Sequence, residues 1–115
     1  MYVNIENLKK FLGSDEAFIA LLMVKFIQEC PKETARLKEF AGQNNWERTK
    51  AVSHKMLSST KIFGLLEFTF ILKQVEEFSE TRTNLEKMED LVYKVEIECK
   101  NVLAEMKQIR ATLPK

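Results

Sequence analysis

The sequence predicts an all-α protein, an antiparallel up-and-down four-helix bundle with a short extra N-terminal helix. Apolar residues recur at spacings of three and four along most of the chain, and no segment shows the alternation of a half-buried β-strand. The 115 residues include only 3 Gly and 2 Pro, so turns are few and the helices are long. This length suits one hydrophobic core, and we expect residues 1–115 to form a single domain.

The first half of the chain is expected to hold a short helix and a long one. The short helix covers about residues 4–12. Ser14 is expected to cap the long helix, whose acidic start at Asp15 suits a helix N-terminus. We expect this helix to run to Gly42 as one element that is kinked at Pro31.

Two further helices follow, each marked by the residues at its ends. The first covers about residues 45–63, with Asn44 and Glu47 at the spacing of a capping pair. Gly64 is expected to end it, because glycine readily adopts the left-handed conformation that closes many helices. The next helix covers about residues 65–78.

The last helix has the clearest pattern. Thr83 and Glu86 have the spacing of a capping box, and the helix is expected to continue to about Thr112. Its apolar positions are Leu85, Met88, Val92, Val95, Cys99, Val102, Met106, Ile109 and Leu113. This stripe predicts packing inside the bundle, although a coiled-coil dimer would also need one.

The expected helices differ in length, so one end of the bundle should overhang. The last helix would span roughly 43 Å and the helix at about 45–63 roughly 28 Å, at the usual rise per residue. The apolar run at residues 17–24 is wider than a single stripe. It could contact the short first helix or this overhang as well as the bundle.

Composition excludes several classes of protein. The 18 basic and 17 acidic residues give no overall field that would hold nucleic acid or an anionic membrane. The longest apolar run is far below the roughly 18 residues of a membrane span, and the N-terminus lacks the order of a secretory signal. We therefore expect a cytoplasmic protein. Cys30 and Cys99 signal neither a zinc site nor a disulfide framework, and we expect reduced thiols.

His54 is the only histidine, and helical geometry predicts that it faces solvent. The expected buried side carries Trp46, Val52, Met56, Thr60 and Phe63. His54 lies about 160° from Met56 around the helix. The residues expected on or beside its face are Glu47, Lys50, Ser58, Lys61, Arg48 and Lys55. Four cations and one acid would thus surround an exposed imidazole.

Taken alone, an exposed histidine on a lysine-rich face is an ordinary surface feature. A hydrolase would need a pocket, an oxyanion site and an orienting carboxylate, and nothing on this helix face supplies them. A haem or metal site would need a second ligand opposite His54, and no other histidine exists. We therefore expect no metal and no cofactor.

The residues around His54 resemble the signature of the histidine-containing phosphotransfer (HPt) family, A-H-x-L-K-G-S-S/A with a glycine ten residues after the histidine. The matching segment is Ser53-His54-Lys55-Met56-Leu57-Ser58-Ser59, followed by Gly64. Residues 4–13 also resemble the family's short leading helix, and Phe26 to Pro31 resembles its F-x-x-x-x-P turn. The resemblance thus extends over most of the chain.

The resemblance implies that His54 accepts a phosphoryl group from a receiver-domain aspartate and passes it to another receiver. The partners would be response-regulator receiver domains and a hybrid sensor histidine kinase. The protein would be a phosphoryl carrier without enzymatic activity of its own, and we expect a monomer. The alternative is a helical protein-interaction adaptor that keeps the fold but has lost phosphotransfer.

Two departures from the family pattern bear on this function. Leu57 stands where the family usually has lysine, and Ser58 where it has glycine. Lys61 or Lys50 on the same helix face could supply the missing positive charge. Lys55 is also expected near the phosphoryl group or the partner. Ser58 is small enough for a partner's backbone to approach, and Leu57 is expected to add an apolar contact for docking.

Overall fold

The computed structural model of the protein describes residues 3, 5–13 and 15–112. These residues form helices and contain no strand, which confirms the predicted all-α class. The helices are α1 (Ile5–Leu12), α2 (Glu16–Gly42), α3 (Trp46–Ile62), α4 (Leu66–Thr81), the short 3₁₀ helix η1 (Leu85–Lys87) and α5 (Met88–Thr112). As predicted, α2 continues through Pro31 as one helix.

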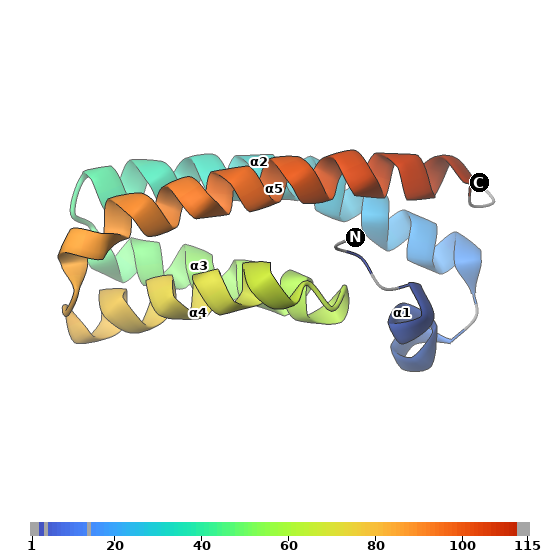
Figure 1. Cartoon of the computed structure of the whole chain (residues 1–115), viewed down its shortest axis with the longest axis horizontal. Coiled ribbons are helices and arrows are strands. Elements are labelled where there is room, and N and C mark those ends of the chain that lie inside the picture. Colours follow the sequence, from blue (N-terminus) through green and yellow to red (C-terminus); the bar gives the residue numbers. More distant parts are fainter. Residues whose placement is uncertain (1–2, 4, 14, 113–115) are drawn as a thin grey trace.

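Helices α2 to α5 form the antiparallel up-and-down bundle. The long pair α2 and α5 lie side by side, and the shorter pair α3 and α4 pack against one part of them (Figure 1). The longer pair extends beyond the shorter one, and α1 lies in the space below this overhang (Figure 1). The molecule is elongated, with principal extents of 44 × 21 × 21 Å.

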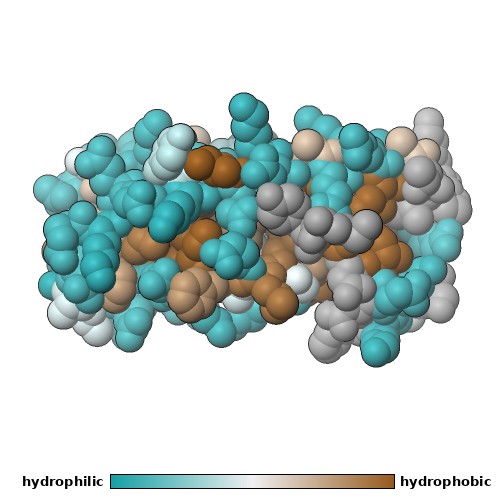
Figure 2. All heavy atoms as spheres, in the orientation of Figure 1, coloured by the Kyte–Doolittle hydropathy of each residue, from teal (hydrophilic) through white to brown (hydrophobic). Residues whose placement is uncertain are grey.

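The core runs along the inside of the bundle. The apolar stripe of α5 faces inward: Met88, Val92, Val95, Cys99, Val102 and Met106 are buried, and Leu85 and Ile109 are partly buried. Leu113 lies outside the described residues. On the face in Figure 2, hydrophilic atoms dominate and hydrophobic ones gather mainly in the band between α5 and α4. The stripe is therefore covered within one chain, and no dimer is needed to bury it.

The apolar run at residues 17–24 is only partly buried. Ile19, Ala20 and Met23 point into the core, whereas Phe18 and Leu21 are 43% and 64% exposed. Leu22 is partly buried against the core, so the run is buried on one side of α2 and exposed on the other. None of the described helices combines the length and hydropathy that a membrane crossing requires.

The N-terminal caps of α2 and α3 differ from the prediction by one residue. Asp15 caps α2, since its Oδ1 accepts a hydrogen bond from the Phe18 N–H at 3.1 Å, and Ser14 lies outside the described residues. Asn45 caps α3, with its Oδ1 accepting from the Arg48 N–H at 3.2 Å. Asn44 instead ends the preceding helix in a left-handed conformation, with φ of 56°. Asparagine tolerates this conformation better than most residues, which explains the shift.

The predicted capping box at Thr83 and Glu86 is wrong, because α5 begins only at Met88. Helix α4 runs on to Thr81, beyond its expected end. Arg82 and Asn84 then both adopt left-handed conformations, with φ of 57° and 52°. The Thr83 hydroxyl pairs with the Thr81 hydroxyl at 2.6 Å and caps no α-helix.

Candidate functional site

His54 lies on the exposed face of α3, as helical geometry predicted. Its side chain is 76% exposed. The opposite face of α3 is buried and comprises Thr49, Ser53, Met56, Leu57 and Thr60. Two residues expected to be buried, Trp46 and Val52, are partly exposed because they lie at the edges of this face. An imidazole this exposed is accessible from solvent.

Glu76 of α4 holds the His54 ring by one nitrogen. Its Oε2 lies 2.6 Å from Nδ1 of His54, and the glutamate side chain is 24% exposed. A carboxylate can only accept a hydrogen bond, so Nδ1 carries the proton and donates it. In a neutral imidazole the lone pair then belongs to Nε2. The contact therefore leaves Nε2 as the nucleophilic nitrogen.

The tight turn between α3 and α4 sets the register that brings Glu76 to His54. Gly64, with φ of 66°, donates its N–H to the Lys61 carbonyl at 3.1 Å, and the Leu65 N–H donates to the Thr60 carbonyl at 3.0 Å. This pair of bonds is the Schellman arrangement that glycine favours. Three side-chain pairs then follow along the hairpin: Thr60 with Thr69 at 2.9 Å, His54 with Glu76 at 2.6 Å and Lys50 with Glu80 at 3.1 Å.

Glutamates pair with two of the lysines near His54. Lys50 forms its ion pair with Glu80 of α4, and Lys55 forms one at 3.4 Å with the buried Glu33 of α2. Arg48 instead packs over the Phe40 ring, 5.6 Å from its centroid. The expectation of four cations against one acid is therefore wrong, because neighbouring helices supply acids that the α3 sequence does not contain.

Two lysines near the site keep their charge unpaired among the described residues. Lys61 is exposed on α3, seven residues beyond His54. Lys73 is exposed on α4, three residues before Glu76 and on the edge that carries Glu76 and Glu80. Sequence reasoning did not identify Lys73, because it lies on another helix.

Leu57 cannot contact a partner as predicted, since it is only 4% exposed and belongs to the core. The helix position that seemed to lie at the edge of the buried face is part of that face. Ser58 is exposed one turn beyond His54, as expected.

A groove of about 500 Å³ lies between α2 and α3, beside the exposed face of α3. Its lining includes Ser58, Lys55, Glu33 and the apolar side chains of Leu22, Phe26 and Ile62. The groove thus joins apolar and charged surface next to His54. No group of three or more His, Cys, Asp or Glu side chains in the described part of the chain is placed to hold a metal ion.

Glu76 is the residue that sequence reasoning missed. Nothing in the local pattern around His54 points to a glutamate twenty-two positions later. The usable signal was the turn that Gly64 marks, because a tight antiparallel hairpin pairs residues that are equally distant from its centre. With the centre at Leu65, position 54 lies eleven residues before it and position 76 eleven residues after it.

Comparison with known proteins supports the fold. No protein-family model and no curated protein matches the sequence. Among solved structures, the chain is similar to histidine-containing phosphotransfer protein B (HptB) from Pseudomonas aeruginosa PAO1, with a TM-score of 0.86 and 17% identity over 96% of this chain and 95% of that one. It is also similar to the HPT domain of a sensor hybrid histidine kinase from Shewanella, with a TM-score of 0.87 and 15% identity over 99% and 97%. The chain therefore has the helical-bundle fold of histidine-containing phosphotransfer proteins.

Proposed function

We propose that the protein carries a phosphoryl group on Nε2 of His54 and relays it between the aspartates of receiver domains. The observation that carries this proposal is the exposed imidazole whose Nδ1 is held 2.6 Å from Glu76. The bundle shared with phosphotransfer proteins and the motif around His54 support it. We further propose that residues 1–115 act as one monomeric domain in the cytoplasm, with a hybrid sensor kinase or its receiver as donor.

The transfer needs one nucleophile from this chain. The Nε2 lone pair attacks the phosphorus of the receiver's aspartyl phosphate, a P–N bond forms, and the P–O bond breaks to release the aspartate carboxylate. The ring becomes positively charged, and the Glu76 carboxylate at Nδ1 stabilises that charge. A carboxylate oxygen of the second receiver's aspartate then attacks the phosphorus, a P–O bond forms, and the P–N bond breaks to return the electron pair to Nε2 and regenerate neutral His54. Magnesium and acidic groups that assist phosphoryl transfer would belong to the receiver.

The phosphoryl group also needs nearby positive charge, because Leu57 offers none. Lys50 is engaged with Glu80, so Lys61 and Lys73 are the better candidates. Lys61 lies about 10 Å along the helix axis from His54, whereas Lys73 lies only about 4.5 Å along α4 from Glu76, which touches His54. A lysine side chain is long and flexible enough to bridge the shorter separation. We therefore propose that Lys73 supplies part of the positive charge near the phosphoryl group, a role that the sequence suggested for Lys61 and Lys50.

Docking of the receiver would use the surface around His54. Ser58 leaves room for a partner's backbone one turn from the imidazole. The adjoining groove offers Leu22, Phe26 and Ile62 to an apolar partner side chain, within a charged rim. Because Lys50 and Lys55 are already paired with glutamates, electrostatic steering should be weaker than an unpaired basic face would give.

Incubation with phosphorylated receivers tests the proposal. Radiolabel should move to the wild-type protein, be labile to acid, and be absent from a His54→Gln variant. Circular dichroism shows whether that variant keeps the fold. Transfer that persists in His54→Gln would refute the assignment of the acceptor.

The adaptor alternative is favoured by one observation, the buried Leu57 in place of a lysine. The adaptor would be supported if the wild-type protein binds receivers stably but no phosphorylated receiver of the same cell labels it.

A Lys61→Ala, Lys73→Ala double variant tests separately whether these two lysines stabilise the phosphoryl group. We expect the double variant to transfer the phosphoryl group about fivefold more slowly, because two exposed positive charges are lost. Lys50→Ala is the control.

A further inference from the structure

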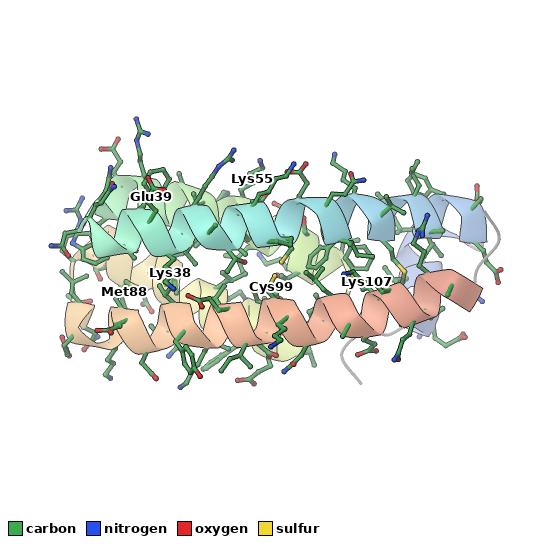
Figure 3. The ribbon with its side chains drawn as sticks, turned by 90° about the horizontal axis from the view of Figure 1, so that it is seen from above. Lys38, Glu39, Lys55, Met88, Cys99 and Lys107 are labelled. Carbon is green, nitrogen blue, oxygen red and sulfur yellow. The ribbon has the colours of Figure 1, made fainter. Side chains whose placement is uncertain are left out.

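Two cysteines far apart in the sequence meet inside the bundle. Cys30 of α2 and Cys99 of α5 are separated by 69 positions, yet their Sγ atoms lie 3.0 Å apart. Both are buried, with 4% and 5% of their surfaces exposed. In Figure 3 the side chain of Cys99 points into the space between α5 and α2. Both cysteines are free thiols, as the sequence predicted, and the structure brings them into direct contact.

The surroundings of the pair favour a thiolate on one sulfur. The Cys30 S–H donates to Sγ of Cys99, and this hydrogen bond lowers the pKa of Cys99 to about 7. The same contact and burial raise the pKa of Cys30, which therefore keeps its proton. The nearby Thr34 hydroxyl lowers the pKa of both thiols, and its oxygen is buried without a hydrogen-bond partner among the described residues. One thiolate beside one thiol is the arrangement from which disulfides form.

We propose that Cys30 and Cys99 are a redox modification site, which a peroxide oxidises to a disulfide between α2 and α5 and which a dithiol reduces. The sulfurs have only to approach from 3.0 Å to the bond length of about 2.05 Å. The inference is independent of phosphotransfer on His54.

The reaction balances in two steps. The Cys99 thiolate attacks one peroxide oxygen, the O–O bond breaks, and hydroxide leaves and takes up the proton lost from Cys99, which gives water and a sulfenic acid. Sγ of Cys30 then attacks the sulfenic sulfur, the S–S bond forms, and the S–O bond breaks as a second water leaves with the Cys30 proton. Two successive thiol–disulfide exchanges with a dithiol restore both thiols.

A route for a small oxidant reaches the pair at Cys30, whose Sγ lies 3.0 Å from the Cys99 sulfur that attacks the peroxide. Cys30 is one of the side chains that line the groove of about 500 Å³ between α2 and α3. Hydrogen peroxide is far smaller than this groove, whereas a bulky thiol reagent would meet a side chain that is only 4% exposed. We therefore expect peroxide to act faster than a large alkylating reagent on the folded protein.

Mass spectrometry tests the proposal on the wild-type protein. The reduced protein is treated with hydrogen peroxide, denatured and alkylated. We expect an intact mass that has lost two hydrogen atoms, no alkylation, a cross-linked peptide pair that contains Cys30 and Cys99, and full reversal by dithiothreitol. The oxidised protein should also unfold at a temperature higher by on the order of 10 °C, because the bond closes a long loop.

A Cys30→Ser variant is the matched control. It retains Cys99, so peroxide should yield a sulfenic acid that dimedone traps, with no stabilisation and no loss of two hydrogens. The wild-type mass measurement decides the question even if this variant is unfolded. Two alkylated cysteines after peroxide treatment, or disulfide-linked dimers in place of the intramolecular bond, would overturn the proposal.

Discussion

The hydrogen bond between His54 and Glu76 offers the sharpest test of the proposed chemistry. Replacing Glu76 with alanine removes the acceptor that lies 2.6 Å from Nδ1. The imidazole then rotates freely and divides between its two neutral tautomers, only one of which has a nucleophilic Nε2. The positive charge that develops on the ring during transfer also loses its carboxylate. Glu76→Ala should therefore slow phosphoryl transfer without unfolding the bundle.

The exposure of His54 determines how much Glu76→Ala should slow phosphoryl transfer. A hydrogen bond that involves a charged group is worth about 1.5–3 kcal/mol. His54 is 76% exposed, so water replaces part of what is lost and the lower end applies. About 1.4 kcal/mol corresponds to a tenfold lower rate constant. Glu76→Gln keeps an oxygen acceptor but removes the charge, and it should fall between Glu76→Ala and the wild type.

Single-turnover transfer from a phosphorylated receiver measures this rate constant. Glu77→Ala is the matched control, because it removes the same charge one position along α4 from an exposed glutamate. Nitrogen-15 chemical shifts of the ring report the tautomer independently of any partner. Equal rates for Glu76→Ala and the wild type, or equal slowing in Glu77→Ala, would refute the positioning role.

Three further predictions concern stability, measured by urea denaturation. Leu37→Ala should lower the free energy of unfolding by about 3 kcal/mol because Leu37 is 0% exposed, whereas Leu21→Ala, at a 64% exposed position, should change it by less than about 0.5 kcal/mol. Gly42→Ala should stabilise by about 0.5–1 kcal/mol, since Gly42 is helical and an added Cβ meets nothing within 4 Å. Gly64→Ala should instead destabilise by about 1 kcal/mol because φ is 66°; similar effects at both glycines would contradict this. Burial and the charge of Glu67 raise the pKa of Glu98 above its ordinary 4.5, so the folded state loses stability as pH rises through that raised pKa. Glu98→Gln should therefore be more stable than the wild type near pH 7, and this gain should vanish at acidic pH.

The sequence was sufficient to predict the bundle because hydrophobic periodicity is a property of each helix alone. The α5 stripe from Met88 to Met106 is buried as predicted. The connection between α4 and α5 was not predictable in the same way. Arg82 and Asn84 adopt left-handed conformations there, and Arg82 in particular carries no sequence signal for it. Tertiary packing decides such conformations.

The same distinction applies to the site. The exposure of His54 depends on α3 alone and was predicted. The partners of Lys50, Lys55 and His54 depend on how α2 and α4 are aligned with α3, so the acids that neutralise the basic face were missed. Leu57 was misplaced for a related reason, because a single helix does not reveal how much of its edge a neighbour covers.

The exposed position of His54 on one face of one helix has a kinetic consequence. The chain has a single histidine, and under the proposed function a receiver that reaches it would cover the surface around it. A donor and an acceptor cannot both occupy that surface, so the donor must leave before the acceptor binds. Steady-state transfer between two receivers should therefore follow ping-pong kinetics, with parallel lines in double-reciprocal plots. The lifetime of the phosphorylated intermediate, free in solution between the two encounters, would then limit how far apart in the cell the two receivers can be.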